Sequence, residues 1–185
     1  MLGAPSSIDQ NLILTGYIGP NQLSIARRVA ERLRMPFVNF EQELEERAEM
    51  PPDELRALYG EARLKTVEGE LIDQMALYRG VILHVSGQTL MHGDNLARLR
   101  ATGPVICLVA TLDAVLQRLH LSMGARYHNP RERDLALGTL RREWAVRGHS
   151  GVLEFDTSYL TEAATVEGVA SLWLQESGII EWHGA

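Results

Sequence analysis

The sequence predicts an α/β domain in which helices wrap a parallel β-sheet. Short runs of apolar and β-branched residues alternate along the chain with longer segments in which apolar residues recur every three or four positions. The chain has 185 residues, of which 45% are hydrophobic and 23% charged. This length is enough for one compact domain with a full core and falls short of two ordinary domains.

The individual elements follow from these patterns. Five short apolar segments are expected to be strands: 11–15, 36–40, 81–85, 104–110 and 152–155. Between the first two, one apolar stripe predicts a helix packed on the sheet: Leu23, Ala26, Val29, Ala30 and Leu33. Further helices are expected at 41–48, 53–59, 61–77, 95–101, 112–121, 131–147 and 161–176. Thr111 and Thr161 are hydroxyl residues placed to cap the starts of two of these helices.

Charge and hydropathy exclude several classes of protein. The formal net charge is −6, and Arg and Glu are interspersed, so no basic face is available for nucleic acid. No apolar run approaches the roughly 20 residues needed to span a bilayer. Residues 1–10 have neither the basic nor the apolar region of a secretory signal. We therefore expect a cytoplasmic protein without a membrane or nucleic-acid partner.

Metal and thiol chemistry are not predicted. The single cysteine, Cys107, lies in the apolar run 105–109 and is expected to be a buried structural thiol. The six histidines show no paired spacing of metal ligands. The sequence therefore predicts no metal site built from these residues.

One loop has the context of a phosphate-binding site. After the first strand the sequence is Gly-Tyr-Ile-Gly-Pro-Asn-Gln-Leu-Ser over 16–24, followed by the first helix. A strand, a glycine-bearing turn and a helix N-terminus hold phosphate because free N–H groups and the helix dipole point at the anion. The functional pattern is Gly-x-x-x-x-Gly-Lys-Ser/Thr. Gly16 and Gly19 provide glycines here, but the last three places hold Asn21, Gln22 and Leu23.

Each replacement makes the loop less suited to nucleotide binding or phosphoryl transfer. Asn21 adds a side chain where close approach is needed. Gln22 is neutral and cannot stabilise charge on a transferring phosphoryl group, and Leu23 cannot coordinate a metal. Ser24 has a hydroxyl one residue later, but one step turns a helix by about 100°. The candidate nucleotide-binding residues are Gly16, Gly19, Asn21, Gln22, Leu23 and Ser24.

Several segments match a known family closely. The segment 12–19 is similar to the first strand and loop of the shikimate kinases, and 30–38 matches their first helix and second strand nearly residue for residue. Glu-Glu-Arg-Ala at 45–48 and Gly-Glu at 60–61 extend the match. The chain therefore resembles a shikimate kinase over about three quarters of its length. The resemblance implies a three-layer P-loop kinase-like fold, with a five-stranded parallel sheet flanked by helices in a single domain.

The resemblance also implies roles for individual residues. The family's Asp-x-Asp pair, which supports Mg²⁺ and contacts the substrate hydroxyls, corresponds to Asn39 and Glu41. Its substrate-gripping Phe-Arg pair corresponds to Leu64-Lys65, and Lys65, the single lysine, keeps the charge without the bidentate fork of arginine. Its three-glycine turn corresponds to Ser86-Gly87-Gln88.

The lid of the family corresponds to the aperiodic segment 122–130, for which an ordinary connector is the alternative. Arg126 stands at the place of the lid arginine, and Arg142 is the best candidate for a later substrate-binding arginine. Glu41 and Arg126 are thus the candidate catalytic residues. The candidate substrate-binding residues are Glu41, Lys65, Gly87 and Arg142. Each charged member has a plain alternative as a solvated surface or helix-terminal charge.

Three functions stay open at this point. The first is a shikimate-kinase-like protein that has lost efficient ATP-dependent activity and acts as a small-molecule-binding, regulatory or partner-binding module. The loss of the lysine, the hydroxyl and the Mg²⁺-supporting carboxylate together motivates it. The second is an active phosphotransferase, from ATP to a small hydroxy-acid, with a rebuilt site; only this alternative calls for ATP and Mg²⁺. The third is a structural subunit that pairs with an authentic kinase. Separately, a protein partner or a homo-oligomer is compatible with the sequence.

Overall fold

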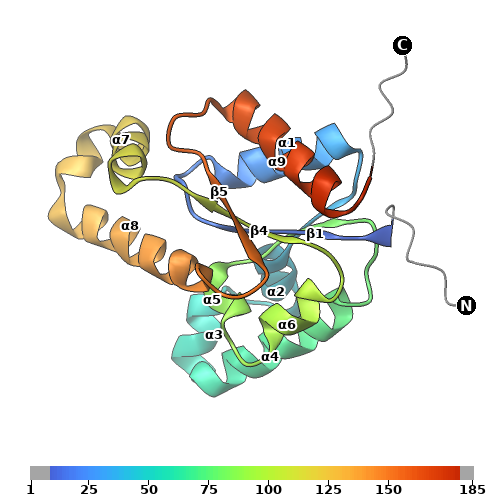
Figure 1. The fold of residues 1–185 in the computed structure, drawn as a ribbon. Coiled ribbons are helices and arrows are strands. Elements are labelled where there is room, and N and C mark those ends of the chain that lie inside the picture. The colour runs from blue at the N-terminus through green and yellow to red at the C-terminus, as the bar shows by residue number, and fades with distance from the viewer. Residues whose placement is uncertain (1–8, 180–185) are drawn as a thin grey trace, which may run out of the picture.

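The computed structural model describes residues 9–179 (Figure 1). Most of the predicted lead-in 1–10 and of the tail 178–185 lies outside the described residues. The five predicted strands are confirmed and form one all-parallel sheet in the order β2-β3-β1-β4-β5. Their bounds are β1 Leu12–Gly16, β2 Phe37–Asn39, β3 Ile82–His84, β4 Val105–Val109 and β5 Val152–Asp156.

Helices cover both faces of this sheet. Figure 1 shows α1 and α9 on one face, α2 to α6 on the other, and α7 with α8 at one side of the molecule. The helices are α1 Gln22–Leu33, α2 Phe40–Ala48, α3 Pro52–Tyr59, α4 Glu61–Met75, α5 Gly87–Leu90, α6 Asn95–Arg100, α7 Leu112–Met123, α8 Pro130–Glu143 and α9 Glu162–Glu176. Within residues 9–179, none of them is long and apolar enough to cross a membrane.

The core lies on the two faces of the central strand β1. Leu12 and Leu14 pack with α1 and α9, whereas Ile13 packs with the helices of the opposite face. This alternation is the period of two that a strand imposes on its side chains. Cys107 of β4 is buried as predicted, and burial raises the pKa of its thiol to about 12. The buried central strands hold the loops at their carboxyl ends in place.

The connection predicted at 122–130 is mostly helical. Helix α7 continues to Met123, a 3₁₀ turn follows over Gly124–His128, and the Asn129 side chain accepts a hydrogen bond from the Arg131 N–H at 3.1 Å to cap α8. The ring of His120 stacks on Tyr127 with centroids 4.8 Å apart. These polar and aromatic contacts stabilise helical turns without an apolar stripe, which is why periodicity did not reveal them.

Helix caps explain the other boundaries. Thr111 and Thr161 accept hydrogen bonds from the N–H groups of Ala114 and Ala164, which confirms both predicted caps. The short helix α5 was not predicted, and it begins because the Ser86 hydroxyl accepts a hydrogen bond from the Thr89 N–H at 3.2 Å. The turn after β3 is therefore shaped by a serine cap.

Candidate functional site

Two cavities open at the carboxyl edge of the sheet, the edge at which open α/β folds bind their ligands. The first, which we call the loop cavity, has a volume of about 390 Å³ and adjoins the turn between β1 and α1. The second, the carboxylate cavity, has a volume of about 500 Å³ and is lined by residues that follow β2 and β3 and by the end of α8. Both lie within the usual size range of small-molecule sites.

The turn between β1 and α1 depends on a glycine. Gly16 has a φ of +93°, and a Cβ at this position would lie 2.3 Å from the carbonyl oxygen of Leu108 in the neighbouring strand. Only glycine combines this backbone conformation with so close an approach. The chain therefore leaves the centre of the sheet sharply at Gly16 and enters the loop.

The side chain of Gln22 occupies the inside of this loop. Its Oε1 accepts a hydrogen bond from the backbone N–H of Ile18 at 3.0 Å, and its Nε2 donates to the carbonyl of Gly16. Gln22 is only 6% exposed. The amide thus satisfies a backbone donor of the kind that phosphate-binding loops offer to an anion.

A half-buried chain of polar side chains continues from Gln22 to the second strand. The Nε2 atoms of Gln22 and His84 lie 3.4 Å apart, and His84 Nδ1 lies 3.4 Å from Asn39 Oδ1. Because the amide nitrogen of Gln22 can only donate, we assign His84 Nε2 as the acceptor and Nδ1–H as the donor to Asn39. Burial lowers the pKa of His84 to about 4, which keeps the ring neutral as this pattern requires.

Residues from distant elements hold the loop from outside. Arg118 of α7 donates to the carbonyl of Ile18 at 3.1 Å and also to the hydroxyl and carbonyl of Thr157. The indole N–H of Trp144 donates to the carbonyl of Tyr17 at 2.9 Å. These bonds join the loop to α7, to the segment after β5 and to the end of α8.

The start of α1 receives a carboxylate from α9. Asn21, the N-cap residue of α1, makes no side-chain cap; its amide donates instead to Glu162 at 2.7 Å. The other carboxylate oxygen of Glu162 pairs with Arg28 at 3.2 Å. A negative charge beside a helix N-terminus is favourable, because it complements the helix dipole. Glu162 therefore stands near a position that would suit an anion.

Carboxylates outnumber basic groups in the carboxylate cavity. Its charged lining residues are Glu41, Asp53, Glu68 and Glu143 against Arg56 and Arg142. Arg56 is already paired with Asp53 and Glu61, both at 2.8 Å. Arg142 donates to the Thr139 hydroxyl at 3.2 Å. Among the interactions described, no carboxylate is bonded to Arg142. Arg142 is thus the cation of this lining that a ligand could approach.

Glu68 and Glu143 are tied into the walls of this cavity. Glu68 is buried, accepts a hydrogen bond from the Thr89 hydroxyl at 3.0 Å and lies 2.5 Å from His92 Nδ1. Glu143 accepts a hydrogen bond from the backbone N–H of Gly87 at 2.8 Å. Burial raises the pKa of Glu143, and the charge of Glu41 raises it further, against the lowering effect of the bonds from Gly87 and Ser86.

The predicted nucleotide-binding residues are only partly brought together. Gly19, Asn21 and Gln22 line the loop cavity, and Gly16 shapes the turn beneath it. Ser24 is exposed on α1 and is not among the lining residues, and Leu23 is half-buried outside the lining as well. The loop cavity therefore carries three of the predicted residues in its wall.

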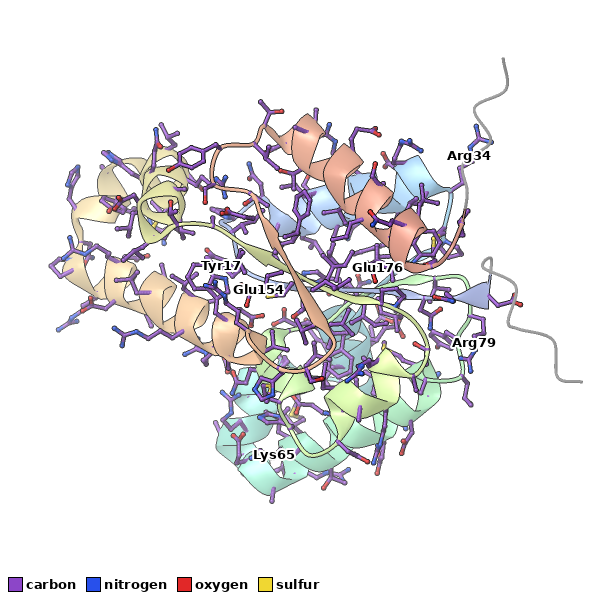
Figure 2. The ribbon with its side chains drawn as sticks, viewed as in Figure 1. Tyr17, Arg34, Lys65, Arg79, Glu154 and Glu176 are labelled. Atoms are coloured by element: carbon purple, nitrogen blue, oxygen red, sulfur yellow. The ribbon has the colours of Figure 1, made fainter. Side chains whose placement is uncertain are left out.

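The predicted substrate and catalytic residues separate into two groups. Glu41 and Arg142 line the carboxylate cavity, and Gly87 begins α5 at its wall. Lys65 is not in that lining; it lies 3.9 Å from Glu61 on α4, and Figure 2 places it at the lower rim of the molecule, far from Tyr17 in the loop. Arg126 is exposed and paired with Glu132 at 2.7 Å. The structure therefore does not bring Lys65 or Arg126 to either of these cavities.

Four residues of the site were not singled out from the sequence: Arg118, Glu143, Glu162 and Trp144 as a donor to the loop. Each acts on a partner at least 56 positions away. No local pattern marks such a residue. Within residues 9–179, no group of three or more His, Cys, Asp or Glu side chains is arranged to hold a metal ion.

The strand order and the loop between β1 and α1 define a P-loop kinase-like fold, and solved structures agree. Shikimate kinase from Bacteroides thetaiotaomicron superimposes with a TM-score of 0.70 at 21% identity, covering 90% of this chain and 96% of the other. Shikimate kinase from Acinetobacter baumannii in complex with shikimate superimposes with a TM-score of 0.66 at 17% identity, covering 91% and 93%.

Sequence comparison gives the family. A family model described as shikimate kinase matches residues 23–167. Shikimate kinase from Desulforudis audaxviator is 30% identical over 179 residues, which are 93% of this chain and 90% of that protein. The chain belongs to the shikimate kinase family, and the resemblance is confirmed. The family match begins directly after Gln22, so the loop itself lies outside the matched range.

Proposed function

We propose that this member of the shikimate kinase family does not transfer phosphate from ATP efficiently. It acts instead as a small-molecule-binding, regulatory or partner-binding module. The observation that carries the proposal is the position of the Gln22 side chain, which bonds the Ile18 N–H and the Gly16 carbonyl inside the loop. A nucleotide phosphate would have to displace this amide before it could reach the Ile18 N–H.

The residues around the loop do not fit a Mg²⁺-bound triphosphate. The place of the phosphate-binding lysine holds neutral Gln22, and the place of the metal-binding hydroxyl holds Leu23. Asn39, at the place of the metal-supporting carboxylate, is neutral and lies against His84. Because phosphoryl transfer depends on positioning and electrostatic stabilisation, these changes remove the main contributions a protein makes.

A rebuilt site would need another cation facing the loop. Arg118 is the arginine of the loop cavity, but its guanidinium donates to the carbonyls of Ile18 and Thr157. Arg126 points to Glu132. Neither contact favours the active phosphotransferase over the module.

The test is a measurement of turnover and binding on the full chain. We expect no shikimate-dependent release of ADP above background with ATP and Mg²⁺, assayed beside the Desulforudis audaxviator enzyme as a positive control. Turnover on the order of 10 per second, an ordinary enzyme rate, would contradict the proposal. Calorimetric titration with ATP·Mg²⁺, ADP and shikimate then separates the alternatives. Binding of the acid alone favours a ligand-binding module, and binding of none favours a structural subunit.

A further inference from the structure

Charge is distributed unevenly between two groups of helices. The segment 41–73, which covers α2, α3 and most of α4, carries eleven acidic and four basic side chains. The segment 112–147, which covers α7, α8 and the 3₁₀ turns after them, carries seven arginines and four acidic side chains. Figure 1 shows α8 at one side of the molecule and α2 to α4 on one face of the sheet. The molecule therefore has an acidic and a basic surface on different elements.

The outward face of α8 combines an arginine with an exposed leucine. The buried Leu140 marks the side of this helix that packs on the core. On the opposite side lie Arg131, Leu135 and Gly138, spaced by four and three residues. Leu135 is 70% exposed, and the exposed Arg131 side chain makes no hydrogen bond or ion pair with any described residue. This face thus offers an unpaired cation beside apolar surface that is open to water.

Helix α3 presents the same spacing with the opposite charge. Glu54, Ala57 and Leu58 are exposed and lie three and four positions apart, so they share one side of the helix. Leu58 is 62% exposed. In the part of the chain that the structure describes, no hydrogen bond or ion pair reaches the Glu54 carboxylate, whereas the neighbouring Asp53 is paired with Arg56 at 2.8 Å. Each helix thus has a charged residue followed by a leucine about one turn later.

We propose that the outward face of α8 is a docking surface for a second copy of this chain, which contributes the exposed face of its α3. Two helices side by side in the same direction place Arg131 opposite Glu54 of the partner subunit and Leu135 opposite Leu58 of the partner subunit. The two pairs match because each spans four residues, about 6 Å of helix. The ion pair orients the contact, and burial of the two leucines contributes apolar stabilisation.

Charge complementarity selects a second copy as the occupant. One chain supplies both an acidic and a basic face, and each carries an exposed leucine at the matching position. Within one chain, no hydrogen bond or ion pair among the described residues joins these two faces. When α8 of each copy meets α3 of the other, the contact is made twice, as in a two-fold dimer. The inference goes beyond the proposed function, because neither face includes a lining residue of the loop cavity or the carboxylate cavity.

Charge reversal tests the docking on the full chain. Sedimentation velocity at protein concentrations up to about 100 µM and about 20 mM salt should show self-association, and about 500 mM salt should weaken it, because salt screens the ion pairs. Arg131→Glu alone and Glu54→Arg alone should each weaken the association about tenfold or more, since like charges then meet. An equimolar mixture of the two variants should associate again, because the reversed side chains of the two variants then meet each other.

Matched controls locate the contact. Arg133→Glu reverses an exposed arginine of α8 that lies about 160° around the helix from Arg131, and it should leave the association unchanged within about twofold. Leu135→Asn should weaken the association about fivefold or more, because apolar burial is lost. Leu77→Asn, at a leucine that is 78% exposed just beyond α4, should leave it unchanged. Circular dichroism checks that each variant is folded.

Three results would overturn the inference: an unaltered protein that stays monomeric at low salt, a mixture of the two charge-reversed variants that stays monomeric, or equal effects of Arg131→Glu and Arg133→Glu. The proposed function fails in a different measurement. Shikimate-dependent ADP release would contradict the loss of kinase activity and leave the docking inference standing.

Discussion

The backbone N–H of Gly87 donates a hydrogen bond of 2.8 Å to the carboxylate of Glu143, which lies 56 positions further along the chain. The first residue of α5 thereby meets the last residue of α8. A Cβ at Gly87 would lie 1.9 Å from the carbonyl oxygen of Glu143. The two helices thus touch through backbone atoms, and the donor that a ligand of the carboxylate cavity could use is already occupied.

Replacing Gly87 should therefore destabilise the fold. We expect Gly87→Ala to lower the free energy of unfolding by about 1 to 3 kcal/mol, because backbone of α8 must move to admit the methyl group. The matched control is Gly69→Ala in the interior of α4, where an added Cβ meets nothing within 4 Å. That change should stabilise by about 0.5 to 1 kcal/mol through helix propensity. Urea unfolding measures the free energy of unfolding of both variants. If Gly87→Ala stabilised the protein as much as Gly69→Ala does, the backbone of α8 would move at little energetic cost.

Restoring the loop should recover nucleotide binding before catalysis. The triple variant Asn21→Gly, Gln22→Lys and Leu23→Ser removes the amide from inside the loop and adds a cation. We expect ATP affinity to rise by roughly 1.5 to 3 kcal/mol, about ten- to a hundredfold, measured by calorimetry. Adding Asn39→Asp should then raise residual turnover more than affinity. A variant that folds normally by circular dichroism yet binds ATP no better would show that the loop stays closed, with Pro20 as its remaining constraint.

The half-buried His84 should make the free energy of unfolding depend on pH. The pKa of His84 is about 4 in the folded chain, against an ordinary value of 6.5. As pH falls from 6.5 to 4, the unfolded chain binds a proton that the folded chain does not, so the free energy of unfolding falls. Above this window His84 contributes no pH dependence. The loss between pH 7 and pH 4.5 should be about 2 to 3 kcal/mol.

His84→Gln should remove this part of the pH dependence. Carboxylates titrate in the same range, so the measured quantity is the difference between the two proteins in urea unfolding at pH 7 and pH 4.5. If the free energy of unfolding fell equally between pH 7 and pH 4.5 in the two proteins, His84 would be solvated enough to titrate normally.

The charge balance of the carboxylate cavity should govern binding of a hydroxy-acid. We expect Glu143→Gln to strengthen shikimate binding roughly three- to tenfold, because one negative charge leaves a cavity in which carboxylates exceed arginines. In that background Arg142→Ala should weaken binding by about 1.5 to 3 kcal/mol. Lys65→Ala should change it less than twofold, since Lys65 lies outside the lining. A larger effect of Lys65→Ala than of Arg142→Ala would restore Lys65 to the site.

Most of the sheet could be predicted because its signals are local. The apolar run 104–110 contains the strand Val105–Val109, and every residue of that strand is buried. Parallel strands covered on both faces are apolar throughout, so the chain marks them without help from tertiary contacts. Helix α5 and the 3₁₀ turn after α7 lack this signal, because hydroxyl caps and aromatic stacking stabilise them.

The features of the candidate site also divide into those with a local sequence signal and those that depend on tertiary contacts. The amino-acid sequence by itself determined the sheet, the glycine turn after β1, membership of the family's fold and the absence of lysine and hydroxyl from the loop, since each depends on residues close together along the chain. Only the tertiary structure decided what fills the loop and which residues line the same cavity. The amide of Gln22 turns inward, Glu162 accepts a hydrogen bond from Asn21 across 141 positions, and Arg142 and Glu41 line one cavity while Lys65 lies outside its lining. The physical reason is that hydrogen bonds and charge interactions depend on distance in space and not on separation along the chain. The packing of α7, α8 and α9 on the sheet sets those distances.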